Sequence, residues 1–302
     1  MPGPRRPDLD ALRRFTGLGV VACGLVVGLL LPGGAPVLGR LSVPLVALLV
    51  FATLHGTSVA GYSLRGAAGV VVAVIPFGYL VVPGGAALVA GSLDPAAATG
   101  LLVVAASPTT AGSALVWTTV GDGDELLATV GAFATLAVAP VAMPAVLAAL
   151  VGNGVSVPAR PLLVDLSLMV GGGALLAAVV PADALSATGR SRLSLAVVFL
   201  LTYAGVAGAD LAAVDPASLA AVAAAGAGTV AVAGGLAAAG RAISLVDRPT
   251  ATALTYVGSL KNLGVSLATV TTLGVAGAGV FVVAFYVVQQ LVASGLAGLR
   301  AD

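Results

Sequence analysis

The chain has 302 residues, of which 59% are hydrophobic and only 8% are charged, and its mean hydropathy is +1.14. So few polar residues cannot cover the surface of a water-soluble fold, and the composition indicates an integral membrane protein. The net charge of +1 is dispersed along the chain, which excludes nucleic acid as a partner.

Apolar runs separated by charged residues, proline and glycine predict an all-α fold of ten membrane-spanning helices. About 20 residues are needed to cross about 30 Å of hydrocarbon, so this number fills the chain and leaves short loops. In chain order, the predicted spans are Phe15–Leu31, Leu41–Ser58, Gly66–Gly91, Pro95–Val120, Leu126–Leu150, Leu162–Val180, Leu193–Gly208, Leu219–Ala239, Ala251–Leu273 and Val275–Leu296.

The spans fall into two halves of five. Residues 15–150 hold the first half and residues 162–297 the second, with a linker loop at 151–161. An N-terminal segment, 1–14, and a C-terminal tail, 298–302, flank them.

The arginines predict the orientation in the membrane. When loops are counted alternately, Arg40 and Arg160 fall on one side and all other arginines fall on the opposite side. Because short loops rich in arginine stay in the cytoplasm, both termini are predicted to be cytoplasmic and the membrane to be the cell (plasma) membrane. The arginines of this side are Arg5, Arg6, Arg13, Arg14, Arg65, Arg190, Arg192, Arg241, Arg248 and Arg300.

The fourth and ninth spans differ from the others in having a break near the middle. The fourth carries Ser107-Pro108-Thr109-Thr110 and the ninth carries Gly258-Ser259-Leu260-Lys261-Asn262. A proline removes a backbone hydrogen bond, and neighbouring hydroxyls can bond the freed carbonyls. Both spans are therefore predicted to be discontinuous helices.

The two breaks occupy the same place in the two halves. Five spans are an odd number, so the second half enters the membrane from the opposite face and the halves form an inverted repeat. Paired interrupted helices in such repeats predict a substrate and ion site near the bilayer midplane, with alternating access to it.

Two stretches carry a resemblance to a known family. The segments "AASPTTAGSALVWTTVGDGDELLATVGAFATLAVAPVAMP", from Ala105, and "GSLKNLGVSLATV", from Gly258, follow the layout of helices four, five and nine in the bile acid:sodium symporter family. The chain resembles the prokaryotic members of that family. The resemblance implies a secondary active transporter of a small organic anion, with sodium held by a Ser-Asn pair, hydroxyls of helix five, and a glutamate and a glutamine of helix nine.

The chain departs from this pattern at most of the implied sodium ligands. Ser113 and Asn262 remain, whereas the other positions hold Ala114, Ala128, Ala132, Val257 and Lys261. Sodium needs several oxygen donors, preferably with a carboxylate. Transport is therefore expected to be proton-coupled or uncoupled, and a sodium-coupled symporter is the alternative.

Lys261 is the only lysine of the chain and lies in the middle of the ninth span. A lysine there costs about 2.5–3.5 kcal/mol on insertion, so it should face the interior of the bundle. It could replace a bound sodium ion, lose and regain a proton during transport, or offer a fixed charge to an anionic substrate beside the half-helix N-termini. The alternative is a lysine that snorkels to an interface.

Polar residues on the faces of the two broken spans are the predicted substrate-contacting residues. They are Thr109, Thr110, Ser113, Trp117, Ser259, Asn262, Ser266 and Thr269. The alternative is that small polar residues only hold helices together. The predicted ion or coupling site comprises Lys261, Ser113, Asn262 and Asp165, an acid in the sixth span that could relay protons or anchor at the interface.

Other functions find less support in the sequence. One histidine and the absence of HExxH and GxSxG motifs argue against an enzyme, a metal site or a catalytic residue, and no cofactor is expected. A passive channel and a retinal-binding protein are the alternatives of another class. Gln289 and Gln290, near the end of the last span, are expected to mark the membrane interface.

Overall fold

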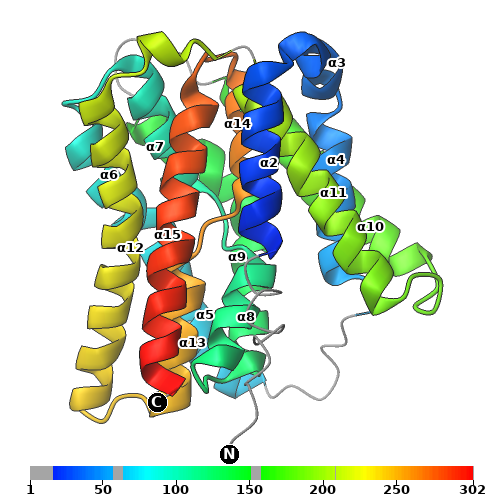
Figure 1. The fold of residues 1–302 in the computed structure, drawn as a ribbon. Coiled ribbons are helices and arrows are strands. Elements are labelled where there is room, and N and C mark those ends of the chain that lie inside the picture. The colour runs from blue at the N-terminus through cyan, green and yellow to red at the C-terminus, as the bar shows by residue number, and fades with distance from the viewer. Residues whose placement is uncertain (1–15, 57–63, 151–157, 208, 302) are drawn as a thin grey trace, which may run out of the picture.

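The computed structural model describes residues 16–56, 64–150, 158–207 and 209–301. The predicted N-terminal segment 1–14 and most of the linker, 151–157, lie outside these residues. Within the described part the chain is all-helical, and its one β-type contact is an isolated bridge (Figure 1).

The helices follow the predicted apolar runs, with short polar or proline-containing turns between them. They are α2 (Thr16–Leu30), α3 (Ala35–Arg40), α4 (Ser42–Leu54), α5 (Leu64–Pro76), α6 (Val82–Ala90), α7 (Pro95–Ala106), α8 (Ala111–Val120), α9 (Glu125–Leu150), α10 (Ala159–Val179), α11 (Ala187–Val206), α12 (Pro216–Ala242), α13 (Arg248–Ser259), α14 (Leu263–Leu273) and α15 (Ala278–Ala301). Three shorter segments lie between them: the 3-10 turns η1 (Pro32–Gly34) and η3 (Leu211–Ala213), and the π-helical turn η2 (Phe77–Val81).

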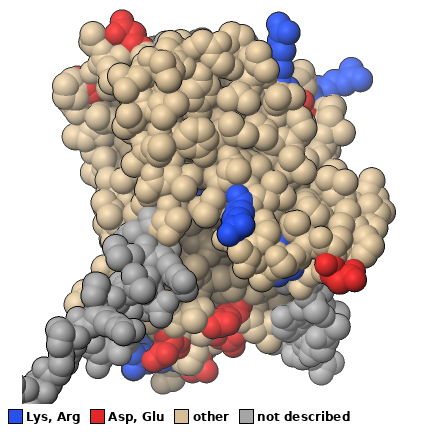
Figure 2. All heavy atoms as spheres, turned by 45° about the vertical axis from the view of Figure 1, so that its right-hand side comes forward, with Lys and Arg blue, Asp and Glu red and all other residues tan. Residues whose placement is uncertain are grey.

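Five helical stretches of the described chain are long and apolar enough to cross a membrane. They are Ala68–Ala90, Glu125–Leu150, Ala159–Val179, Pro216–Ala242 and Ala278–Leu299. A sixth candidate is α2 with Pro32–Arg40, which is bent by 92°. The molecule is thus a multi-pass membrane protein. Charged side chains on the face in Figure 2 are sparse, and most lie toward its two ends, although basic side chains also lie near the middle.

The remaining predicted spans coincide with shorter or more polar helices. α4 has 13 residues, the fourth and ninth spans are each divided in two, and the first two turns of α11 contain Arg190 and Arg192. Length and composition alone therefore leave the ten-span arrangement as a prediction.

The helices pack in two groups. In the first, α10 packs along α4, and α11 packs along α2 and α4. In the second, α12 packs on α13 and α15, α15 on α7, and α9 on α5 and α8. Figure 1 shows α4, α10 and α11 on one side of the molecule and α6, α12 and α15 on the other.

Glycines allow helix axes to approach closely within each group, as is common in membranes. A Cβ atom on Gly173 of α10 would lie 2.6 Å from the carbonyl oxygen of Ala47 in α4. A Cβ atom on Gly226 of α12 would lie 2.5 Å from the carbonyl oxygen of Phe285 in α15. A larger residue at either position would push the two helices apart.

Both predicted helix breaks are present, and the two extended segments cross in the interior. The first separates α7 from α8 and the second separates α13 from α14. The Thr110 N–H donates to the Leu260 carbonyl at 3.0 Å, and the Asn262 N–H donates to the Pro108 carbonyl at 2.8 Å. Each break thereby donates a backbone hydrogen bond to a carbonyl of the other break, in the interior where water is scarce.

A π-helical turn, η2, joins α5 to α6 beside this crossing. The Val82 N–H donates to the Phe77 carbonyl, five residues earlier. In this register the next donor would be the nitrogen of residue 83, which is a proline and has no N–H. The carbonyl of Gly78 is therefore left without a helical partner.

Candidate substrate and ion site

Lys261 lies at the crossing and points into the protein. Its side chain is 1% exposed, and its Nζ donates to the Gly78 carbonyl at 2.8 Å and to the Ser107 carbonyl at 3.1 Å. The ammonium also lies 5.8 Å from the centroid of the Tyr79 ring. One side chain thus joins the second break to η2 and to the first break.

The two carbonyls are available because the helices that carry them are interrupted. Pro83 removes the donor that would bond Gly78, and Ser107 follows the last residue of α7, where helical carbonyls have no partner along the chain. The C-terminal end of a helix carries partial negative charge and favours a cation. The arrangement resembles the carbonyl cage of an ion site, with the ammonium as the cation.

Gln289 of α15 holds the backbone on either side of Leu260. The Lys261 N–H donates to Gln289 Oε1 at 3.0 Å, and Gln289 Nε2 donates to the Ser259 carbonyl at 2.6 Å. Gln290 Oε1 accepts from Trp117 Nε1 at 2.8 Å. The prediction that both glutamines mark the interface is wrong, since they are 0% and 3% exposed and lie halfway along α15.

Thr109 fixes the first break in a similar way. Its hydroxyl donates to the Val257 carbonyl at 2.6 Å, and its N–H donates to Thr135 Oγ1 of α9 at 3.1 Å. The Tyr79 hydroxyl donates to the Thr135 carbonyl at 2.7 Å. The crossing is therefore bonded to α9 and η2 as well as to α15.

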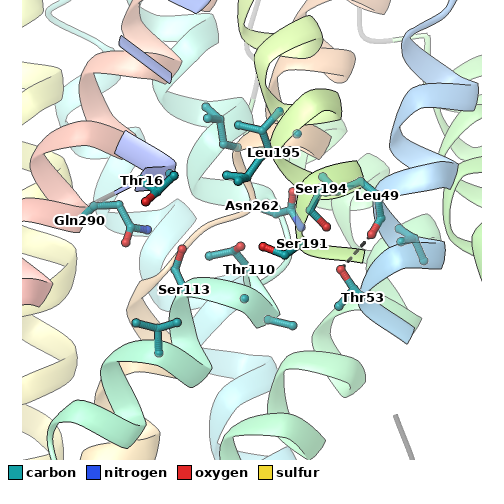
Figure 3. A pocket seen from close by; sticks show the side chains of 18 of the residues that line it. Thr16, Leu49, Thr53, Thr110, Ser113, Ser191, Ser194, Leu195, Asn262 and Gln290 are labelled. Atoms are coloured by element: carbon teal, nitrogen blue, oxygen red, sulfur yellow. Dashed lines mark hydrogen bonds between the residues drawn. The ribbon is translucent and has the colours of Figure 1, made fainter. Parts of the chain in front are cut away.

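A cavity of about 780 Å³ lies next to the crossing, between the two groups of helices. Thr110 and Ser113 line one wall, whereas Ser191 and Ser194 of α11 and Thr53 of α4 line the facing wall (Figure 3). Five of the predicted substrate-contacting residues belong to the lining, namely Thr109, Thr110, Ser113, Trp117 and Asn262. The broken helices thus bring several of the predicted residues to one cavity wall, and their contact with a substrate stays a prediction.

The other predicted site residues lie outside this lining. The Ser259 hydroxyl donates to the Thr255 carbonyl, Ser266 Oγ lies 2.9 Å from Ser107 Oγ, and Thr269 is fully buried in α14. Asp165 of α10 accepts a hydrogen bond from Thr272 at 3.3 Å, away from the crossing. A direct role of these residues in binding stays a prediction.

The cavity is also lined by residues that the sequence did not single out. Among the described residues that line the cavity, Arg192 carries the charge, and Tyr286 of α15 lies with its hydroxyl 3.4 Å from Ser113 Oγ. Ser191, Arg192 and Ser194 were assigned to a loop and to the start of a span, but α11 already begins at Ala187, capped by Ser186. Ser186, a residue type favoured at helix N-caps, was the sequence signal that could have indicated this earlier start of the helix.

Several of the positions implied as sodium ligands hold alkyl side chains in a packed apolar cluster. Ala114, Ala128 and Val257 are fully buried and belong to one apolar cluster with Trp117 and Tyr256. A Cβ atom on Gly131 would lie 2.8 Å from Val257 Cγ1, so the cluster is tightly packed. Alkyl side chains offer no oxygen to a cation, in contrast to the carbonyls around Lys261.

Comparison with known proteins places this architecture in a family. A search of curated proteins gives no significant match. The family model of the SBF-like CPA transporters matches residues 63–298, which include both helix breaks, the π-helical turn and most of the cavity. The chain therefore belongs to the SBF-like CPA transporter family, in agreement with its resemblance to the bile acid:sodium symporters, and is a transporter.

Proposed function

We propose that the protein is a secondary active transporter that moves a small organic anion by alternating access without sodium coupling. The observation that carries the proposal is the ammonium of Lys261, held by two carbonyls at the crossing of two broken helices beside a large polar cavity. The substrate would bind in the cavity, and the lysine would take the place of the coupling ion.

The arrangement of the elements supports ten spans in two inverted repeats. The breaks fall in the fourth element of each half, between α7 and α8 and between α13 and α14. With α5, η2 and α6 taken as one span, each half then has five. Both termini would lie on the cytoplasmic side of the cell membrane.

The position of the cavity supports alternating access. One wall comes from α8 and α15 of the second group and the other from α2, α4 and α11 of the first, so the two groups meet across it, while α14 packs against both. Movement of one group against the other would open the cavity to either side of the membrane while the crossing stays intact.

The chemistry of the wall supports an anionic substrate. Thr110 is the N-cap of α8 but makes no side-chain capping bond, and Ala111, Gly112 and Ser113 of the first turn all line the cavity. Free N–H groups at a helix N-terminus favour anions. Arg192 adds a positive charge, and the surrounding hydroxyls can accept or donate hydrogen bonds.

Sodium coupling is disfavoured because the lysine already supplies a cation where one is needed. The carbonyls of Gly78 and Ser107 are bonded by Nζ, and the alkyl side chains at the implied sodium positions cannot replace them. Whether the lysine exchanges a proton decides between proton coupling and uncoupled transport. Uptake of a substrate with and without an imposed pH gradient separates these two.

Thermal unfolding of the purified protein in sodium chloride and in choline chloride, at equal ionic strength, tests the role of the lysine. The wild type is expected to unfold at the same temperature in both salts. Lys261→Gln is expected to unfold at a lower temperature in choline chloride and to regain stability in sodium chloride, because the carbonyl cage then lacks its cation. Arg40→Gln removes one positive charge elsewhere and serves as the control.

Stabilisation of the wild type by millimolar sodium would contradict the proposal and favour a sodium-coupled symporter. Uptake into proteoliposomes separates a transporter from a channel. Radiolabelled benzoate, lactate and pyruvate serve as small anionic probes. Saturable uptake that accumulates a probe against its gradient excludes a passive channel.

A further inference from the structure

A second cavity, of about 400 Å³, lies where α12 ends and α13 begins. It is distinct from the cavity at the crossing and shares no residue with it. Its lining consists of Ala238, Arg241, Ala242, Arg248, Ala251 and Thr252. Two arginines thus line a small hollow whose other lining residues are three alanines and a threonine.

The cavity lies at the end of a helix that faces lipid. The stretch Pro216–Ala242 is a membrane-span candidate, and Val232 and Leu236 are 50% and 57% exposed on its outer side. Arg241 belongs to the last turn of this helix. The hollow is therefore expected at the boundary between hydrocarbon and headgroups.

The turn between the two helices carries exposed apolar side chains. Ile243 and Leu245 are each 75% exposed, and Ser244 between them has a positive φ of 58°. Ile243 lies seven residues after Leu236, so it continues the lipid-facing stripe of α12. Bulky apolar side chains in a short turn beside arginines are typical of a segment that dips into the membrane interface.

Two nearby carboxylates, those of Asp247 and Asp124, bond backbone N–H groups at helix starts. Asp247 caps α13, where the side chain and the backbone N–H of Thr250 bond its carboxylate and hold the pKa of Asp247 below its usual range. The Asp124 N–H donates to the Pro249 carbonyl, while its carboxylate accepts from the Leu127 N–H. Neither acid belongs to the lining.

We propose that this cavity binds the phosphate of an anionic phospholipid, with Arg241 and Arg248 as its ligands and the acyl chains along the exposed face of α12. Guanidinium groups match phosphate oxygens in geometry and charge. Basic pockets between membrane helices bind anionic headgroups, which are abundant in the cytoplasmic leaflet. A free phosphate ion shares the headgroup chemistry but gains nothing from Ile243, Leu245 and α12, so the lipid is favoured.

Thermal unfolding in neutral detergent, with added phosphatidylglycerol, phosphatidylcholine or inorganic phosphate, tests the assignment. Phosphatidylglycerol is expected to raise the unfolding temperature of the wild type more than the other two additives. The double variant Arg241→Gln/Arg248→Gln should lose at least half of that rise. Arg40→Gln/Arg160→Gln removes the same charge elsewhere and should keep all of it.

A second pair of measurements separates the lipid from a free anion and guards against a misfolded variant. Ile243→Ser/Leu245→Ser keeps both arginines and is expected to reduce the rise given by phosphatidylglycerol. Native mass spectrometry of the wild type should show bound phosphatidylglycerol in preference to phosphatidylcholine. An equal rise in the arginine variant, equal stabilisation by inorganic phosphate, or no lipid preference in the mass spectra would each overturn the proposal.

Discussion

A lysine ammonium inside a membrane protein is tolerated here because backbone carbonyls replace its water. Nζ has three N–H groups, of which two bond Gly78 and Ser107, and the face of Tyr79 lies nearby. The sequence predicts the burial of Lys261, because a lone charge in the middle of a span must face the bundle. Its partners could not be predicted, because they are backbone atoms of other spans and have no side-chain signature.

Gln289 provides a test at a single residue. Gln289→Leu removes the partner of the Lys261 N–H and of the Ser259 carbonyl, both of which lie in the buried break. An unpaired buried polar group costs about 1–3 kcal/mol, so the variant should lower the free energy of unfolding by about that amount or more. Unfolding in a detergent titration measures it.

The adjacent residue gives the matched control. Gln290→Leu removes an acceptor of the Trp117 indole but leaves the backbone of the break bonded. It is expected to cost less than Gln289→Leu. An equal or larger loss in Gln290→Leu would show that Gln289 does not support the crossing.

Two prolines interrupt the helices around the site and so decide which backbone carbonyls are available to Lys261. Pro108 follows Ser107, the C-cap of α7, and Pro83 removes the helical donor for the carbonyl of Gly78 in η2. Both leave a carbonyl that an intact helix would have bonded, and Lys261 bonds both. The break at Pro108 was predicted from its neighbouring hydroxyls, whereas the π-helical turn was missed because Pro83 lies in an apolar run without polar neighbours.

A double-mutant cycle tests whether Pro83 and Lys261 act together. Pro83→Ala returns an N–H that can bond the Gly78 carbonyl, so Lys261→Met should cost less in that background than in the wild type. The coupling is expected to be about 0.5 kcal/mol or more in the free energy of unfolding. Pro76→Ala with Lys261→Met is the control cycle and should be additive, and additivity in the Pro83 cycle would contradict the mechanism.

For the whole molecule, the sequence predicted the helical class, the two breaks and the wall that they supply to the cavity. These rest on local signals, namely apolar runs and interrupting proline, serine and threonine. The facing wall comes from α4 and α11, whose polar residues Thr53, Ser191 and Ser194 are scattered singly along the chain. Only the packing of the two groups of helices brings them opposite Thr110 and Ser113, so no local pattern could identify them.

The cavity between the groups leads to a prediction about accessibility. Its wall includes α8, which lies in the same half of the molecule as the end of α15 (Figure 1). With cytoplasmic termini, a cysteine in the cavity should react with a membrane-impermeant maleimide in inverted vesicles before it reacts in right-side-out vesicles. Cys23 is exposed, so the experiment needs a Cys23→Ser background.

In that background, Ser194→Cys places a thiol on the cavity wall contributed by α11, and Thr269→Cys places one in the packed interior of α14. Ser194→Cys should be labelled rapidly from the inverted side and slowly from the other side, because alternating access exposes the cavity to each face in turn. Thr269→Cys should resist labelling from both. Rapid labelling of Ser194→Cys only in right-side-out vesicles would contradict cytoplasmic termini, and labelling of Thr269→Cys at a comparable rate would contradict a cavity confined to the space between the two groups of helices.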